Sequence, residues 1–345
     1  MYAIVLGCAI VGLNGTSVPN NKANQKYRVV VVKHKYAFGE AQAVENIVSA
    51  AANIGWECVA VLDSDFNLEK IKALQPNFII SLREEIVPLE GYINFLYLHV
   101  PMYMYLNKDG TLCTRAYPNV LKYQGFLNVV PNASPVKAAF ENVNKKPFYS
   151  VQTVFSVKSR GFNDALKTRL CYSGGSLWDE KRAGTNYKQV YNLLDQTGYM
   201  GIYGSARAWE KMGLKSYRGF LPMDDHTVVD TISEAGIALV LHSHEHIRGG
   251  VPTSRIFEAA AASAVIICDH HPFVEKEFGD SVLYIDTHQA PEVIFKQIDD
   301  HVKWVKANPD KAIALARRSH AIFMERFTLE NELKKIGELY ERMVK

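Results

Sequence analysis

Short apolar runs that alternate with helical patterns constrain the fold of this chain more than any other feature of its sequence. The run at 27–33 (YRVVVVK) precedes a helical pattern at 41–54, and the runs ECVAVL and NFIIS follow at 57–62 and 77–81. Strands that are apolar on both faces and alternate with helices are typical of parallel sheets covered on both sides. This part of the chain therefore predicts a doubly wound α/β domain, with a further strand at 92–99.

The second half of the chain repeats the same pattern. Strands are expected at 169–173 (RLCYS), 237–242 (IALVLH) and 264–268 (AVIIC), with helical patterns between them. The length of 345 residues exceeds the roughly 250–300 residues that one hydrophobic core usually serves. We therefore expect an α/β protein with two Rossmann-like, doubly wound domains facing a cleft.

The domain boundaries follow from changes in this pattern. From residue 100 to about residue 146 the sequence is rich in Tyr, Asn and Pro, which suits a connection between domains. We place the first domain with this connection at 1–147, the second at 148–326 and a last helical segment at 327–345.

Composition excludes several classes of protein. Hydrophobic residues make up 48% and charged residues 22% of the chain, which is typical of a folded protein. A net charge of +3 is too small to indicate a nucleic-acid binder. Five widely spaced cysteines suit a reducing compartment, and the apolar run at 3–13 is too short for a bilayer. We expect a cytoplasmic protein and leave peripheral contact with the inner face of a membrane open.

The segment at 239–269 concentrates polar groups between two apolar strands. A helix is expected from Pro252, with Thr253 or Ser254 as its cap, so that free backbone N–H groups point beyond the strand ends. Such a helix start is a place for phosphate. Arg248 and Arg255 add fork-shaped donors for a diphosphate.

Glu258 follows one turn after Ser254 and is suited to accept hydrogen bonds from ribose hydroxyls. The alternative is a simple pair between Arg255 and Glu258 along the helix. The apolar surroundings FEAAAASA favour a ligand, because a buried charged pair without one is costly.

The run PTSRIFEAAAASAVIICDHHPFVEKEFGDSVLYID resembles the nucleotide-sugar site of GT-B glycosyltransferases, especially the group-one type with an Arg-x-Phe-Glu-Ala signature, as in spore-maturation CgeB-like proteins. CYSGGSLWDEKRAG resembles the loop that opens the donor domain of this family, and IYGSARAWE the strand after it. The resemblance implies an acceptor domain at 1–147, a donor domain at 148–326 and a helix at 327–345 that returns to the first domain. It also implies that Glu258 holds the donor ribose.

One position departs from the family pattern. Many retaining members carry a second Glu eight residues before the first, where this chain has Gly250. A retaining outcome is favoured by the resemblance alone. An inverting enzyme needs a general base near the acceptor, for which His34, Glu40 and His99 are the candidates.

The candidate site draws on both domains. Arg182, in a glycine-containing loop, and Arg248 are expected to stabilise the departing diphosphate, and His99 resembles a first-domain His found near the sugar. A solvated loop position for Arg182 and a strand-end residue bonded to backbone for His99 are the alternatives.

The candidate catalytic residues are His99, Arg182 and Arg248. The candidate donor-binding residues are Gly174, Gly175, Arg182, Tyr203, Gly204, His244, Arg248, Thr253, Ser254, Arg255 and Glu258. The candidate acceptor-binding residues are His34, Glu40 and Tyr103.

The histidines of the second domain offer an alternative reading as a metal site. If His242, His244 and His246 continued a strand, their side chains would share one face, as zinc ligands do. Histidines that bond a sugar or a phosphate without a metal are favoured, because no second-shell partner is evident. We expect no metal and no cofactor beyond the donor.

The prediction is a glycosyltransferase that moves a sugar from a nucleoside-diphosphate sugar to a hydroxyl acceptor, such as a glycan or a glycolipid. A catalytically weak or inactive nucleotide- or sugar-binding protein on the same fold is the alternative, which Gly250 keeps open. An epimerase or phosphorylase is a third hypothesis and would show turnover without a separate acceptor. A phosphorylase that uses pyridoxal phosphate is disfavoured, because no lysine near 242–269 suits a Schiff base. A nucleic-acid-modifying transferase has little support from a net charge of +3.

Overall fold

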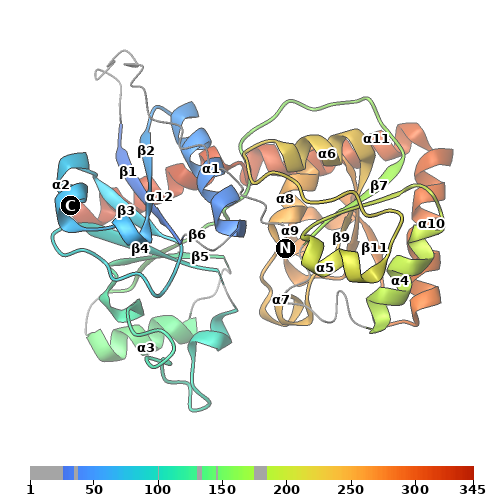
Figure 1. The fold of residues 1–345 in the computed structure, drawn as a ribbon. Coiled ribbons are helices and arrows are strands. Elements are labelled where there is room, and N and C mark those ends of the chain that lie inside the picture. The colour runs from blue at the N-terminus through green and yellow to red at the C-terminus, as the bar shows by residue number, and fades with distance from the viewer. Residues whose placement is uncertain (1–25, 35–37, 100, 130–133, 145–146, 175–184) are drawn as a thin grey trace, which may run out of the picture.

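The computed structural model describes residues 26–34, 38–99, 101–129, 134–144, 147–174 and 185–345. Figure 1 shows two α/β domains side by side, each built on one parallel sheet. The predicted fold class of two doubly wound domains is therefore confirmed.

The first sheet has six parallel strands in the order β2-β1-β3-β4-β5-β6. Its strands are β1 (Arg28–Lys33), β2 (Glu57–Leu62), β3 (Phe78–Ser81), β4 (Ile93–Leu98), β5 (Gly125–Asn128) and β6 (Tyr149–Gln152). Its helices are α1 (Phe38–Asn53), α2 (Leu68–Leu74) and α3 (Ser134–Asn144), with one-turn 3-10 helices η2 (Asp63–Asp65), η3 (Met102–Tyr105) and η4 (Val120–Lys122).

Alternate residues of β1 serve the two faces of this sheet. Val29 and Val31 pack in a cluster with α1, whereas Val30 and Val32 pack with Ile71 of α2 on the opposite face. A strand buried on both faces has no polar positions, which explains the unbroken run VVVV.

The sequence suggested that the stretch from residue 100 to residue 146 is a connection between domains. In the structure it is part of the first domain. It contributes β5 and α3 to the first domain, and β6 extends the sheet past residue 147 to Gln152. Both strands have only four residues, GFLN and YSVQ, and are too short to show a period. The chain crosses to the second sheet over residues 153–168.

The second sheet has five parallel strands in the order β11-β10-β9-β7-β8. Its strands are β7 (Arg169–Ser173), β8 (Met200–Tyr203), β9 (Gly236–Val240), β10 (Val265–Asp269) and β11 (Leu283–Ile285). Its helices are α4 (Thr185–Asp195), α5 (Ala206–Trp209), α6 (Thr227–Ala235), α7 (His244–Gly249), α8 (Ser254–Ala261), α9 (Pro272–Phe278), α10 (Pro291–Ala307) and α11 (Pro309–Arg326), with one-turn 3-10 helices η5 (Glu210–Met212) and η6 (Gly279–Ser281).

The last helix, α12 (Leu329–Val344), lies on the first sheet (Figure 1). Leu333, Ile336 and Leu339 are buried in the same cluster as Val29 and Val31. The N–H of Leu329 donates to the carbonyl of Val157 at 2.9 Å, so the second crossing between the domains runs beside the first.

Candidate active site

Polar residues that follow the strands of both sheets meet where the two domains touch. The carboxyl ends of parallel strands are where open α/β sheets bind ligands. In the second domain, the segments after β7, β8 and β9 carry the predicted donor residues, and in the first domain α1 and η3 approach them. We describe the site from the second domain outward.

The connection between β9 and α8 is partly helical, where the sequence predicted a loop. Ser243 caps α7 by accepting the N–H of His246 at 3.1 Å, and Gly250 ends this helix in a left-handed conformation with φ of 64°. α8 begins at Ser254 rather than at Pro252, with Thr253 as its capping residue. The hydroxyl oxygen of Thr253 is buried and has no hydrogen-bond partner among the described residues.

Glu258 is buried on α8, with 4% of its surface exposed. Burial raises the pKa of its carboxyl, and the nearby Arg255 and the side chain of Ser254 offset part of that rise. The amide of Gln42, on α1 of the first domain, donates to Oε1 of Glu258 at 3.4 Å. The carboxylate predicted to hold ribose therefore lies at the contact between the domains.

Arg255 reaches from α8 to the end of β7. Its Nε donates to the backbone carbonyl of Ser173, which directs the guanidinium toward the start of the loop that follows β7. This loop carries Gly175 and Arg182, which lie outside the described residues. The side chain does not serve only as a partner of Glu258, as the simple pairing alternative required.

Gly174 and Gly204 bring the ends of β7 and β8 together. The N–H of Gly174 donates to the carbonyl of Tyr203 at 2.9 Å, and a Cβ on Gly204 would lie 2.1 Å from the oxygen of Gly174. The indole N–H of Trp209 also donates to the carbonyl of Gly174, at 2.9 Å. These predicted donor residues have a packing role that accounts for glycine at both positions.

Arg248 and Tyr103 meet across the domain contact. The Arg248 guanidinium lies 4.6 Å from the centroid of the Tyr103 ring, in a cation–π geometry. The Tyr103 hydroxyl donates to the carboxylate of Glu245, and burial followed by this bond raises the pKa of Tyr103 to about 12. A predicted acceptor residue and a predicted diphosphate residue are thus brought together, while His244 is exposed at the start of α7.

The other first-domain candidates are engaged with neighbours of their own. The backbone N–H of His34 donates to Glu40 at 3.2 Å, and Glu40 also pairs with Arg83. The imidazole of His34 lies 3.4 Å from the carboxylate of Asp63. Because Glu40 already pairs with a guanidinium, it is the weaker of these two candidates for a general base.

His99 stands at the end of β4. Its ring stacks on Tyr97 with centroids 5.9 Å apart, and its Nδ1 lies 4.0 Å from the carboxylate of Glu84. That nitrogen is buried and has no hydrogen-bond partner among the described residues. His99 is therefore not fixed by a backbone bond through Nδ1, which was the alternative reading of this position.

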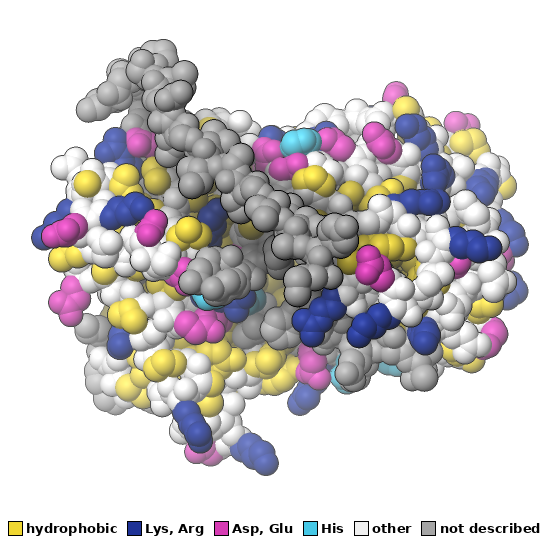
Figure 2. Space-filling model, in the orientation of Figure 1, with side chains coloured by type: hydrophobic (Ala, Val, Ile, Leu, Met, Phe, Trp, Pro, Cys, Tyr) yellow, Lys and Arg dark blue, Asp and Glu magenta, His cyan; other side chains and the backbone are white. Residues whose placement is uncertain are grey.

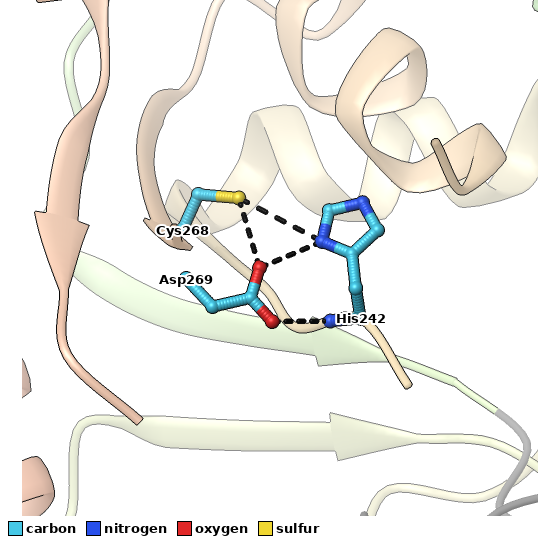
Figure 3. Close-up of side chains that lie close together, drawn as sticks. All are labelled: His242, Cys268 and Asp269. Carbon is cyan, nitrogen blue, oxygen red and sulfur yellow. Dashed lines mark hydrogen bonds and ion pairs between the residues drawn. The ribbon is translucent and has the colours of Figure 1, made fainter. Parts of the chain in front are cut away.

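A buried polar cluster lies at the ends of β9 and β10 (Figure 3). Asp269 accepts hydrogen bonds from the backbone N–H of His242 at 2.6 Å and from its Nδ1 at 2.7 Å. The thiol of Cys268 lies 3.4 Å from the same carboxylate. All three side chains are buried; burial raises the pKa of Asp269, but the electrostatic interaction and the hydrogen bonds with His242 outweigh it and lower the pKa.

The zinc alternative built on three histidines is not supported by this geometry. His244 and His246 belong to α7, whereas His242 lies two residues after β9 and bonds Asp269, so the three do not share a strand face. The atoms of His242, Cys268 and Asp269 do lie within 4.8 Å of one another, which is close enough for a cation. Hydrogen bonds already engage the Asp269 carboxylate from two donors of His242.

A second group, Asp224, Asp225 and His226, is also close enough for a cation. Asp224 caps α6 by accepting from the N–H of Thr227 at 2.6 Å, and Asp225 binds Lys158 at 2.5 Å. Lys158 also bonds the Ser49 hydroxyl at 3.1 Å, so this group ties α1 and the domain crossing to the second domain. Its polar atoms have structural partners.

Comparison with known proteins gives two findings. Residues 175–338 match the family described as glycosyl transferase-like. No curated protein matches the chain in sequence.

Solved structures share the arrangement of both domains. HepE from Anabaena in complex with UDP-glucose is 10% identical with a TM-score of 0.58, over 92% of this chain and 100% of that chain. A sucrose-phosphate synthase from Thermosynechococcus elongatus is 11% identical with a TM-score of 0.58, over 92% of this chain and 99% of that chain. The chain has the GT-B fold. The predicted resemblance to GT-B glycosyltransferases is thereby confirmed.

The pneumococcal O-GlcNAc transferase GtfA, in complex with UDP and GlcNAc, also shares the GT-B fold at 14% identity and a TM-score of 0.53. That alignment covers 80% of this chain and 59% of GtfA, so the chain spans less than two thirds of that protein.

Among the described residues, no helix is long and apolar enough to cross a membrane.

Sequence reasoning missed two residues at the GT-B domain contact, Gln42 and Glu245. Gln42 lies in the pattern of an ordinary amphipathic helix, and nothing near it in the sequence indicates a partner 216 positions away. Glu245 stood out only as a carboxylate near the loop; a tendency of 243–249 to form a capped helix, with Ser243 before it, was the available signal.

Proposed function

We propose that this protein is a glycosyltransferase that moves a sugar from a nucleoside-diphosphate sugar to a hydroxyl acceptor held between its two domains. The observation that carries the proposal is the buried carboxylate of Glu258 at the domain contact, beside Arg255 and within reach of Gln42. A buried carboxylate suits sugar hydroxyls, and the guanidinium beside it suits phosphate. The glycosyl transferase-like match at 175–338 includes this helix.

The positions of the cationic side chains indicate which domain binds the donor and which binds the acceptor. Arg248, Arg255 and the first turn of α8 lie in the second domain, which suits a donor whose diphosphate leaves with negative charge. We assign contact with the acceptor to Tyr103 and His99 in the first domain. We propose a hexosyl donor and a retaining outcome, the latter on family resemblance, with a glycan or glycolipid as acceptor.

Two relatives in fold were solved with UDP or UDP-glucose, so uridine donors are the first to test. Figure 2 shows Lys and Arg side chains interspersed with Asp and Glu over the face that it presents, which favours small anionic ligands over a nucleic acid. We place the enzyme in the cytoplasm, and co-sedimentation with anionic vesicles would detect peripheral membrane contact.

The first prediction tests the donor site. Glu258→Gln should weaken nucleotide-sugar binding about 10- to 100-fold, because a hydrogen bond to a charged group contributes roughly 1.5–3 kcal/mol. A panel of nucleotide sugars, scored by thermal shift and by release of nucleoside diphosphate, measures both binding and turnover. The exposed Glu338 on α12 supplies the matched control, Glu338→Gln, which should behave as the wild type.

The outcomes separate the possible functions. Binding and transfer that depend on Glu258 support a glycosyltransferase. Nucleotide binding with no transfer to any acceptor would instead indicate a binding protein. If no nucleotide sugar stabilises the wild type, the assignment of α8 as the donor site is wrong.

The second prediction concerns metal. The proposed leaving-group stabilisation uses Arg248, Arg255 and the helix start, so we expect transfer to proceed without a metal ion or other cofactor. Turnover should be unchanged, within about twofold, by EDTA and by added Mg²⁺ or Mn²⁺, since cationic side chains supply the charge. A loss of turnover with EDTA that Mg²⁺ restores would contradict metal independence.

A further inference from the structure

A buried histidine supports the turn between α7 and α8. His271 is fully buried, and its Nδ1 accepts the backbone N–H of Phe273 at 3.1 Å. Because a backbone N–H only donates, the proton of the neutral ring must lie on Nε2. That nitrogen lies 3.2 Å from the carbonyl of His246 and 3.1 Å from the carbonyl of Val251.

These two carbonyls stand on either side of the turn. His246 lies within α7 and Val251 just before α8, and the N–H of Val251 donates to the same His246 carbonyl at 3.0 Å. One imidazole therefore ties both sides of the turn to the end of β10. Burial, the largest cause, lowers the pKa of His271 to about 3, so the ring keeps this donor arrangement at neutral pH.

A second histidine, His242, packs against the ring of His271. The two ring centroids lie 4.1 Å apart, and Asp269 holds His242 through its Nδ1 and its backbone N–H. Figure 3 shows the Nδ1 edge of the His242 ring facing Asp269 and Cys268, with Nε2 on the other edge. His271, His242 and Asp269 thus form a rigid polar stack at the ends of β9 and β10.

The turn that this stack holds carries groups at the domain contact. Just before it, at the end of α7, Arg248 extends to the ring of Tyr103, and Gly249 lies against Pro101 of the first domain. Beyond Val251 the chain enters α8, which carries Arg255 and Glu258. A shift of the turn would therefore move both the Arg248 side chain and the start of α8.

We propose that His271, supported by His242 and Asp269, is a positioning residue for the donor site: it fixes the turn between α7 and α8 so that Arg248 and the first turn of α8 face the donor diphosphate. This inference rests on the proposed function. It predicts that His271 affects the donor more than the acceptor, although its side chain touches neither.

The test compares three variants of the full chain. His271→Leu removes the donor to both carbonyls at similar volume, His271→Gln retains an amide donor and an acceptor, and His270→Ala changes the exposed neighbour, which pairs with Glu275. We measure uridine diphosphate affinity, donor and acceptor KM, and hydrogen exchange of residues 244–254. His271→Leu should weaken nucleotide binding and raise donor KM about tenfold, the equivalent of one lost hydrogen bond.

The same variant should raise donor KM more than acceptor KM and speed exchange in 244–254. His271→Gln should recover most of the affinity, and His270→Ala should match the wild type. If His271→Leu folds and binds nucleotide as the wild type does, the positioning role is wrong. If it does not fold, Asp269→Asn decides: a donor KM equal to that of the wild type overturns the inference, and a selective rise supports it. A wild type that binds no nucleotide overturns the proposed function together with this inference.

Discussion

At the scale of single residues, burial acts in opposite directions on the ionisable groups of the second domain. It raises the pKa of the Glu258 carboxyl and lowers the pKa of the His271 imidazole, because in both cases the neutral form is easier to bury. Asp269 differs: burial raises its pKa, but the electrostatic interaction and the hydrogen bonds with His242 outweigh burial, so the pKa is lowered. Each group therefore has a distinct effect on stability as pH changes.

The third prediction follows from His271. Its pKa is about 3 in the folded protein and about 6.5 in the unfolded chain, so below pH 6.5 only the unfolded chain takes up the proton. The contribution of neutral His271 to the free energy of unfolding should therefore fall by about 1.4 kcal/mol per pH unit as the pH decreases from 6.5 toward 3. Denaturant unfolding of the wild type and His271→Gln from pH 7 to pH 5 checks this, since the variant should lose less stability. Parallel curves for the two proteins would contradict it.

The sequence was informative about residues whose partners lie nearby in the chain. Arg255 and Glu258 share one helix, and the signature around them indicates their chemistry without knowledge of the fold. Gln42, which approaches Glu258 from another domain, had no such signal. His271 was visible as one of a pair with His270, but its burial, which separates the two, depends on how β10 ends against the turn before α8.

At the scale of elements, hydrophobic runs predicted the long strands and helices, while short elements escaped. β5 and β6 are four residues each and pair only through the sheet, so their periodicity is too brief to identify. α7 has six residues and a histidine-rich sequence, and it forms because Ser243 and Gly250 supply its two caps. Tertiary context therefore decided β5 and β6, whereas local caps decided α7.

The fourth prediction tests the packing of α12. Gly337 faces the first sheet, and a Cβ there would lie 2.9 Å from the Tyr27 ring and 3.0 Å from the Trp56 ring. Alanine in a helix is favoured over glycine by about 0.5–1 kcal/mol, whereas overpacking a filled core costs about 1–3 kcal/mol. The second effect should win, because the two rings pack against each other at 4.8 Å and cannot easily withdraw.

Gly337→Ala should therefore lower the free energy of unfolding by up to about 2 kcal/mol, the difference of these two effects. Denaturant titration measures it, with the exposed Glu338→Ala as a control on the same helix that should change stability little. A gain in stability for Gly337→Ala would mean that the rings move aside.

At the scale of the whole molecule, polar contacts between described residues hold the domains in the observed arrangement. Gln42 donates a hydrogen bond to Glu258. Tyr103 donates to Glu245, and the guanidinium of Arg248 packs on the Tyr103 ring. Lys158 bonds both Ser49 and Asp225. The first two involve residues proposed for substrate binding, so closure of the domains and assembly of the site are linked.

The fifth prediction uses a close approach between the domains at Gly249 and Pro101. A Cβ on Gly249 would lie 2.6 Å from the Cβ of Pro101, so Gly249→Ala should separate α7 from the first domain. We expect the open arrangement to be favoured by about 1–3 kcal/mol, the usual cost of overpacking, with a matching loss of transfer. Distances between spin labels on the two domains report the opening. Gly161→Ala, in the crossing segment where a Cβ meets open space, should leave the distances unchanged.

The position of α12 also has a consequence for synthesis. Leu333, Ile336 and Leu339 complete the apolar core of the first domain, yet they follow the entire second domain in the chain. As the chain leaves the ribosome, the first domain emerges with α1 covering only part of one face of its sheet, and the rest of that face stays uncovered until residues 153–328 have been made. The domain that is synthesised first is thus the one whose core is completed last.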